Sequence, residues 1–298
     1  MASDVIIAPG CGAEYTALPI RDLSMHKLAT SFSSIVTRVA LCLLALCHPG
    51  FSHAENSVLD RVVESGVLRV AMSVDQPPFN MRNRDKAIVG FDVDLAQALA
   101  GAMHVKLEIV ELPFGDLLPT LAQDKVDAVI SGLSITPERT LQVSFIGPYT
   151  LSGKSMLTTA RIKKVVKNPA EFNDPEIRIV ALNGSTSESF VKSKLPRASL
   201  TTIPNYNDGI EQLLTGSVDA MVADIPILQI AKLRYPEAGL DIIEPQLSVE
   251  PLGIAIGKED RQFANLLRNY LHAFEKVGLI PNLRKKWFED NSWIVALP

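Results

Sequence analysis

The sequence predicts an α/β protein made of two similar lobes, each a mostly parallel sheet flanked by helices. Strand-like and helix-like runs alternate along most of the chain after residue 55, as they do where helices connect parallel strands. Residues 118–131 and 210–224 echo each other, since both combine a helical run, a tight turn, Val-Asp-Ala and an apolar strand. These strands deliver polar residues to their ends, Ser131 in one lobe and Asp224 in the other. A site in the cleft between the lobes is therefore expected.

Residues 1–54 are predicted to be an upstream extension followed by a secretory signal peptide. Met25 is the expected start, because a short basic region and the apolar run 39–46 follow it. Ser52-His53-Ala54 then supplies a small-x-small cleavage site after Ala54. The apolar run is too short to span a bilayer. The sequence thus predicts an exported protein without a membrane anchor.

The composition narrows the class of protein further. All three cysteines, Cys11, Cys42 and Cys47, lie before residue 55, so the exported part has none and must rely on an ordinary hydrophobic core. Such a chain is expected in the bacterial periplasm. The formal net charge of −4 and the lack of a basic stripe argue against binding to nucleic acid or to an anionic membrane. Without cysteines or paired histidines, no metal site is expected.

The first lobe opens with elements that local sequence rules predict. The paired prolines Pro77 and Pro78 cannot continue a strand or a helix, so they are expected in a loop. Phe91, Leu95 and Leu99 recur at four-residue spacing, which is typical of a helix with one buried face. The expected elements are a strand at 67–72, a loop at 76–79, a helix from Gly90 to about Met103, a strand at 106–110 and a helix through Leu117, Leu118 and Leu121.

The most informative stretch runs from Ser131 to Arg139, after the apolar run 126–130. That run predicts a strand buried on both faces. Thr136-Pro137-Glu138 marks a helix start, with Thr as N-cap, Pro in the first helical position and an acid in the first turn. Arg139 is then expected beside free backbone N–H groups at the positive end of the helix dipole, an arrangement suited to a carboxylate. The alternative interpretation is a capped helix with a solvated arginine.

The second lobe repeats the delivery of a strand into a helix N-terminus. The apolar run 177–182 is followed by Asn183-Gly184-Ser185-Thr186, and Ser185 with Glu188 has the spacing of a capping box. A capping box satisfies only some of the four free N–H groups, so helix capping and anion binding both stay open. The remaining expected elements are strands at 240–243 and 251–256, an amphipathic helix containing Phe263, Leu267 and Phe274, and core residues Trp287 and Phe288.

Several motifs in one order resemble the polar amino-acid-binding family of periplasmic solute-binding proteins, which feed ABC importers. The motifs are residues 68–71, 77–79, 89–96, 127–132 and 135–139, and the resemblance covers residues 56–287. It implies a two-lobed Venus-flytrap fold with a discontinuous first lobe. The implied parts are residues 55–157 and 251–298 for lobe 1, residues 158–250 for lobe 2, and hinge strands near 157–159 and 250–252.

The resemblance also implies roles for individual residues. Arg139 corresponds to the family arginine that grips the ligand α-carboxylate, and Ser134 and the Thr186 backbone would add donors from the two lobes. Asp224 corresponds to the acid that pairs with the α-ammonium group. The planar guanidinium of arginine matches a carboxylate better than the point charge of lysine does. The other residues expected at the ligand are Ser131, Gly132, Ser185, Ser73, Phe114 and Gln76.

The side-chain pocket departs from the family at one wall. Phe114 matches an apolar wall, but Gln76 stands where many relatives carry an aromatic residue. An amide at this position weakens the case for a large cationic or aromatic ligand held between two rings. The expected lining is polar, which favours a polar or acidic amino acid. It consists of Gln76, Ser73, Asn183, Lys154 and Glu188.

The predicted function is capture of an amino acid and its delivery to the membrane permease subunits of an ABC transporter. The protein is expected to be a monomer with no cofactor and no catalytic residues. The alternative is a cyclohexadienyl (prephenate or arogenate) dehydratase, which shares the fold and resembles residues 59–71. Glu188 and Lys154 would then be candidates for acid–base or carboxylate-binding roles, although the capping box already accounts for Glu188.

Overall fold

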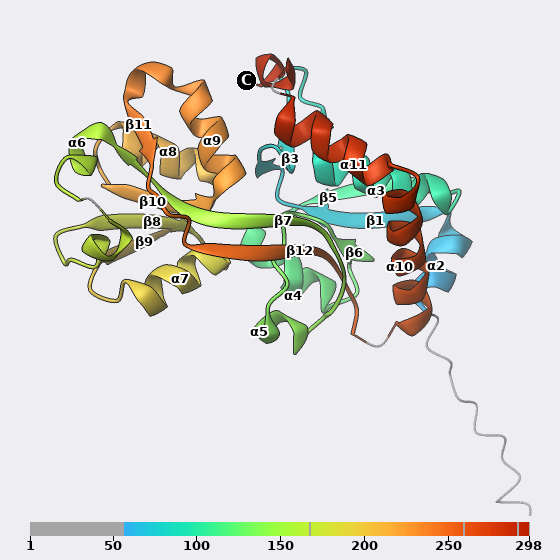
Figure 1. Ribbon diagram of the computed structural model, residues 1–298. Helices are drawn as coiled ribbons and strands as arrows, with labels where there is room; N and C mark the ends of the chain where they lie inside the picture. Colours follow the sequence, from blue (N-terminus) through green and yellow to red (C-terminus); the bar gives the residue numbers. More distant parts are fainter. Residues whose placement is uncertain (1–56, 167, 259, 291, 298) are drawn as a thin grey trace, which may run out of the picture. The chain divides into compact units, whose positions relative to one another are not determined.

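Figure 1 shows the computed structural model of the chain, which describes residues 57–166, 168–258, 260–290 and 292–297. The predicted signal peptide, with its start at Met25 and its cleavage after Ala54, lies outside the described residues. The α-helices are α2 (Val58–Ser65), α3 (Phe91–Ala102), α4 (Leu117–Leu121), α5 (Pro137–Thr140), α6 (Ala160–Lys163), α7 (Thr186–Lys194), α8 (Tyr206–Leu214), α9 (Ile225–Arg234), α10 (Arg261–Lys276) and α11 (Leu279–Arg284). Short 3₁₀ or π-helical turns, η1 to η5, cover Phe114–Asp116, Pro169–Phe172, Pro236–Ala238, Lys285–Glu289 and Ser292–Ala296. None of the helices in this part of the chain combines the length and the apolar character of a membrane span.

The described strands form one large sheet of nine strands and one small sheet of three. The strands are β1 (Val67–Met72), β2 (Asp75–Gln76), β3 (Asn80–Arg82), β4 (Ile88–Val89), β5 (Lys106–Glu111), β6 (Ala128–Val129), β7 (Ser144–Thr159), β8 (Arg178–Leu182), β9 (Ser199–Ile203), β10 (Ala220–Asp224), β11 (Leu240–Ile242) and β12 (Ser248–Ile256). The large sheet has the order β5-β1-β6-β12-β7-β10-β8-β9, and β11 pairs with β7.

Each lobe contributes three parallel strands to the large sheet: β5, β1 and β6 in the first lobe, and β9, β8 and β10 in the second. The long strands β7 and β12 pair antiparallel with each other, with β12 next to β6 and β7 next to β10. They run side by side between the lobes, which are therefore joined through one continuous sheet (Figure 1). This arrangement confirms the predicted α/β fold class. The lobe boundaries at residues 157 and 250 stay predictions.

Helices cover both faces of the large sheet, which explains why its inner strands β1, β6, β8 and β10 are mainly apolar, whereas the edge strands β5 and β9 carry exposed polar residues. Successive side chains of a strand point to opposite faces. In β1, Leu68 and Val70 pack in the cluster that contains α3 and α10, whereas Ala71 packs in the cluster that contains α4. In β10, Met221 packs with α8 and α9, whereas Val222 packs with α7. Burial on both faces is typical of parallel sheets.

The internal echo of the sequence becomes an arginine–aspartate clasp in each lobe. Asp127 accepts the backbone N–H of Arg69 at 2.8 Å and its guanidinium Nη2 at 2.7 Å. Asp219 accepts the same two groups of Arg178, both at 3.0 Å. Arg61 adds a further bond to Asp127 at 2.8 Å. The aspartate of each Val-Asp-Ala therefore connects two strands of its lobe. Asp127 joins β1 to the start of β6, and Asp219 joins β8 to the start of β10.

Asp127→Ala is expected to lower the free energy of unfolding by about 3 kcal/mol. Asp127 is 1% exposed and accepts charge-assisted bonds from Arg61 and Arg69, each of which contributes roughly 1.5–3 kcal/mol. Both arginines stay partly exposed, so water compensates for part of the loss. Urea-induced unfolding measures the change. Glu64→Ala, on the exposed side of α2, serves as the control and is expected to change stability by less than about 0.5 kcal/mol.

Two predicted elements differ in extent from the structure. The strand expected at 126–130 is limited to β6, because its pairing with β12 is confined to the single pair Val129 and Ala255. The loop expected at 76–79 is flanked by β2 and β3, which form the small antiparallel sheet with β4. Pro77 and Pro78 occupy the turn between these two strands, as their lack of backbone N–H groups requires.

The C-terminal tail packs against the first lobe, where α10 shares a core cluster with β1 and α3. The indole N–H of Trp287 donates to Asp94 at 2.8 Å, and its ring lies 5.3 Å from that of Trp293. The ring of Phe288 lies 5.3 Å from that of Phe79. Trp287 is a core residue, as predicted, whereas Phe288 is half-buried and packs against the core.

Candidate functional site

Arg139 reaches the contact between the two lobes from the helix start that the sequence predicts. Thr136 caps α5 by accepting the Arg139 backbone N–H at 3.3 Å. The guanidinium donates from Nη1 to the Ser134 carbonyl at 2.9 Å and from Nη2 to the Gly184 carbonyl at 3.2 Å. Its Cζ lies 5.7 Å from the ring centroid of Phe114. Arg139 therefore links the two lobes beside the predicted apolar wall.

The electrostatic surroundings of Arg139 suit an anionic ligand. Burial lowers the pKa of its guanidinium, while the charges of Glu250 and Asp224 act in the opposite direction. An arginine stays protonated in proteins. Among the described residues, no carboxylate forms an ion pair with this guanidinium. A half-buried guanidinium whose observed bonds are to carbonyl groups can still bind a carboxylate in bidentate geometry.

Asp224 lies at the end of β10, where it forms an ion pair with Lys154. Lys154 is 1% exposed and donates to Asp224 Oδ1 at 3.3 Å and to Glu250 Oε2 at 2.9 Å. Burial raises the pKa of Asp224, and Lys154 opposes this effect. The site thus contains an ammonium group held between two carboxylates.

Glu250 collects donors from both lobes. Its Oε2 accepts the Ser134 hydroxyl and, at 2.8 Å, the Thr186 hydroxyl. Its Oε1 accepts the Ser248 hydroxyl at 3.2 Å. Burial favours a higher pKa for Glu250, but Lys154 and the hydrogen bonds from Ser134 and Thr186 outweigh it and lower this pKa below its ordinary value. Glu250 is missed by the sequence-based prediction, although a charged residue on a strand that crosses between two lobes is an available signal.

A hydrogen-bonded chain holds the turn that follows β6. Ser131 Oγ accepts the Ser73 N–H at 3.0 Å, and Gln76 Nε2 donates to Ser73 Oγ at 2.7 Å. The Gly132 N–H donates to Asp92 at 2.8 Å. Gly132 has a φ of +54°, and a Cβ at this position would lie 2.9 Å from Gln76 Oε1. Both features favour glycine here. The turn brings together four of the predicted site residues, Ser73, Gln76, Ser131 and Gly132.

Asp92 holds this turn in place through a hydrogen bond from the Gly132 N–H. It is fully buried and accepts the Tyr149 hydroxyl and the Asn80 amide, both at 3.0 Å, as well as the Gly132 N–H. Burial raises the pKa of Asp92 to about 6, even though these bonds act in the opposite direction. Asp92 does not appear among the residues predicted from the sequence, because its role is to hold Gly132 in place.

The two hydroxyl residues at the start of α7 have different roles. Ser185 Oγ accepts the Glu188 N–H at 3.2 Å, as the capping box predicts. The Glu188 carboxylate accepts the Gly184 N–H at 2.7 Å, one residue before the expected partner. Ser185 therefore serves the helix, while the Thr186 hydroxyl reaches Glu250. Of the two, the structure brings the Thr186 side chain into contact with the other candidate groups.

Asp75 forms a second contact between the lobes. Its Oδ2 accepts the backbone N–H of Tyr206 at 3.3 Å, and its Oδ1 has no hydrogen-bond partner among the described residues. Burial raises the pKa of Asp75 to about 6, although its hydrogen bonds act in the opposite direction. The contact therefore buries a carboxylate that is only partly satisfied.

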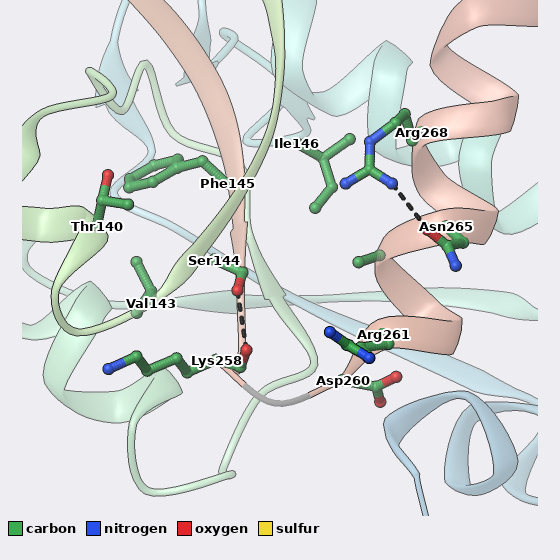
Figure 2. Close-up of a pocket in the computed structure, with 11 residues that line it drawn as sticks. Thr140, Val143, Ser144, Phe145, Ile146, Lys258, Asp260, Arg261, Asn265 and Arg268 are labelled. Carbon is green, nitrogen blue, oxygen red and sulfur yellow. Dashed lines mark hydrogen bonds between the residues drawn. The ribbon is translucent and has the colours of Figure 1, made fainter. Parts of the chain in front are cut away.

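A separate groove of about 760 Å³ lies beside β7 and α10 (Figure 2). Lys258, Arg261 and Arg268 line it, and Arg268 Nη1 donates to Asn265 Oδ1 at 2.8 Å. None of the predicted ligand-binding residues lines this groove. In the part of the chain that the structure describes, no cluster of three or more His, Cys, Asp or Glu residues is arranged to hold a metal ion.

Comparison with known proteins places these features in a family. The model of the bacterial extracellular solute-binding proteins, family 3, matches residues 68–290. Cyclohexadienyl dehydratase of Pseudomonas aeruginosa is 32% identical over 254 residues, covering 84% of this chain and 93% of that protein. The ABC transporter arginine-binding protein 1 of Escherichia coli is 30% identical over 224 residues, covering 74% of this chain and 90% of that protein.

Solved structures share the fold. An ancestral amino acid-binding protein, a precursor of cyclohexadienyl dehydratase, has a TM-score of 0.72 at 34% identity and covers 78% of this chain and all of its own. A putative ABC transporter binding component from Wolinella succinogenes, complexed with lysine, has a TM-score of 0.73 at 33% identity and covers 77% of this chain and 99% of its own. The fold is the predicted two-lobed periplasmic-binding-protein fold, and this chain belongs to the family 3 bacterial extracellular solute-binding proteins.

Proposed function

We propose that the protein captures an α-amino acid between its lobes in the periplasm and delivers it to the permease subunits of an ABC transporter. The observation that carries this proposal is Arg139, a half-buried guanidinium that bonds to a carbonyl group of each lobe and has no carboxylate partner among the described residues. The ligand carboxylate would bind Arg139 with donors from Ser134 and Thr186, and the ligand ammonium would bind Asp224. Binding proteins for arginine and glutamine among the relatives support the assignment.

The side chain of the ligand is proposed to be polar or acidic. Gln76 and Ser73 are hydrogen-bonded to each other and give the predicted pocket a polar wall, while Phe114 gives it an apolar one. A polar wall binds an aliphatic side chain poorly, because its own groups would lose hydrogen bonds to water.

A thermal-shift screen against the twenty common amino acids tests the proposal. A bound ligand at a hundredfold excess over Kd stabilises the folded protein by about 2.7 kcal/mol, so at least one amino acid is expected to raise the unfolding temperature clearly. If none does, and mass spectrometry finds no amino acid carried through purification, amino-acid capture is rejected. N-terminal sequencing of the exported protein is expected to begin at Glu55, and light scattering is expected to give a monomer.

The affinity for the ligand is expected to fall as the pH rises through about 6, because of Asp75. Asp75 accepts the Tyr206 N–H from the other lobe, and its burial raises its pKa from 3.8 to about 6. We expect this burial to be lost when the lobes separate. The closed form is stabilised by protonated Asp75; this stabilisation is fully present below pH 3.8 and is lost as the pH rises through 6. Since one pKa unit corresponds to a factor of ten, the loss is on the order of a hundredfold at most. Calorimetric titration between pH 4.5 and 7.5 measures it.

Asp75→Asn is expected to flatten this dependence, since the amide keeps the size of the side chain and cannot ionise. Asp224 and Glu250 also change charge with pH, so the comparison of Asp75→Asn with wild type, rather than either profile alone, isolates Asp75. Asp85→Asn, at an exposed turn, is the matched control and should follow the wild-type profile. Parallel profiles for all three proteins would contradict the role assigned to Asp75.

The second candidate function is a cyclohexadienyl dehydratase, favoured by the 32% identity to such an enzyme over 93% of its length. The geometry gives it less support. The Glu188 carboxylate accepts the Gly184 N–H and pairs with Lys192. Burial favours a higher pKa for Glu250, but Lys154 and hydrogen bonds outweigh this effect and lower the pKa. A general acid for removal of a hydroxyl group needs a proton near neutral pH, and the lowered pKa of Glu250 disfavours this role.

An ultraviolet assay for phenylpyruvate formation from prephenate separates the two functions. Wild type is expected to show no rate above the uncatalysed reaction. Turnover that disappears in Lys154→Met would favour the enzyme instead.

A further inference from the structure

The carboxylate of Glu250 accepts the hydroxyl groups of two residues that the proposed function places at the ligand carboxylate, Ser134 and Thr186. Ser134 from the first lobe and Thr186 from the second both donate their hydroxyl groups to Glu250 Oε2, and the two hydroxyl oxygens are 3.4 Å apart. Lys154 donates to the same oxygen at 2.9 Å. A carboxylate oxygen that receives two hydroxyls and an ammonium group is held by charge-assisted bonds. We propose that Glu250 is an internal carboxylate that competes with the ligand carboxylate for the cleft; this inference rests on the proposed function.

The position of Glu250 in the fold makes this competition intramolecular. Glu250 belongs to β12, where it pairs with Ser152 of β7 in the part of the sheet that joins the lobes. From there its side chain reaches one residue of each lobe. A tethered group acts at an effective concentration in the millimolar range, so a ligand must bind better than a permanently available carboxylate. By binding Ser134 of one lobe and Thr186 of the other, the Glu250 side chain holds the lobes together without a ligand.

Lys154 completes the arrangement. It lies between Asp224 and Glu250, so the chain supplies an ammonium group for Asp224 and a carboxylate for the Ser134 and Thr186 hydroxyls. These are the two charges of an amino acid. A zwitterionic ligand can replace both while Lys154 and Glu250 stay paired with each other, and no charge is then left alone in a closed cleft. A ligand without a carboxylate cannot displace Glu250 in this way.

The test measures closure without ligand, by single-molecule energy transfer between dyes on the two lobes. The labels are placed by Glu64→Cys and Ser193→Cys, both at exposed positions, in the full chain with Cys11, Cys42 and Cys47 replaced by serine. Wild type is expected to populate a short-distance state in the absence of ligand. Glu250→Gln is expected to reduce that population at least threefold. Glu211→Gln, an exposed acid on α8, is the control and should match wild type.

A second variant keeps the test decisive if Glu250→Gln folds poorly. Thr186→Val removes one donor hydroxyl and leaves the Lys154–Glu250 pair, and it is expected to shift the distribution in the same direction by a smaller amount. The inference is overturned if Glu250→Gln and Thr186→Val both match Glu211→Gln, or if wild type shows a long-distance state alone.

Addition of L-lysine, L-glutamine or L-glutamate, each at about 1 mM, reads the proposed function separately. If no amino acid closes the wild-type protein, amino-acid capture fails, while the comparison without ligand still decides the role of Glu250. The remaining outcome is that amino acids close wild type and Glu250→Gln alike, with the same distance distribution for both proteins without ligand. That result rejects the role of Glu250 and leaves amino-acid capture standing.

Discussion

Arg139→Ala is expected to lose at least a hundredfold in affinity for the amino acid that the wild-type protein binds. The Arg139 guanidinium is half-buried and bridges Ser134 of one lobe and Gly184 of the other. Without it, the ligand carboxylate enters the closed cleft unpaired, which costs roughly 3–5 kcal/mol. Every 1.4 kcal/mol is a factor of ten in Kd. Isothermal titration calorimetry with the ligand identified by the screen measures the loss.

Two further variants make the Arg139 result specific. Arg139→Lys keeps the charge but not the planar pair of donors, so an intermediate loss is expected. Arg268→Ala removes an exposed arginine in the groove of Figure 2 and should leave the affinity unchanged. An Arg139→Ala protein that is folded by circular dichroism and binds within threefold of wild type would show that Arg139 does not hold the carboxylate.

Lys154→Met is expected to lower the free energy of unfolding by roughly 3 kcal/mol at pH 7.5. Lys154 is 1% exposed and is the cation between Asp224 and Glu250. Its removal leaves two neighbouring carboxylates in a desolvated site, and breaking a buried ion pair on one side costs roughly 3–5 kcal/mol. Protonation of either carboxylate relieves the repulsion, so the deficit should shrink at pH 4.5. Urea unfolding at both pH values measures it.

The double variant Lys154→Met with Glu250→Gln separates charge from packing. If the loss comes from unpaired charge, removal of one carboxylate restores part of the stability, and the coupling free energy exceeds about 1 kcal/mol. If the two losses simply add, with no coupling free energy, Lys154 acts through packing of its aliphatic stem. Lys232→Met, on the exposed surface of α9, is the control and should change stability little.

The elements governed by short-range signals are those that the sequence predicts well. The strand predicted at 67–72 coincides with β1, and α5 begins at Pro137 with Thr136 as its cap. Caps, prolines and apolar periodicity act over a few residues, so one sequence contains the information. For the same reason the sequence places Arg139 correctly in α5. Its bond to the Gly184 carbonyl of the other lobe is seen in the structure alone.

The contacts missed from sequence join distant segments. Glu250 meets Ser134 across 116 positions and Lys154 across 96. These contacts depend on the register of β7 against β12, in which Glu250 lies opposite Ser152, and a shift of one residue turns every side chain to the other face. Neither periodicity nor motif spacing fixes that register. Asp75 escapes prediction similarly, because its burial depends on Tyr206 in the other lobe.

The docking of the C-terminal tail decides what intrinsic fluorescence can report. The chain has two tryptophans, Trp287 and Trp293, and they lie 5.3 Å apart against the first lobe. Trp287 also lines a pocket together with Ile230 and Leu233 of α9 in the second lobe, so its emission is expected to respond both to detachment of the tail and to separation of the lobes. Tryptophan emission alone would therefore not distinguish these two movements, whereas dyes on both lobes report the distance between the lobes.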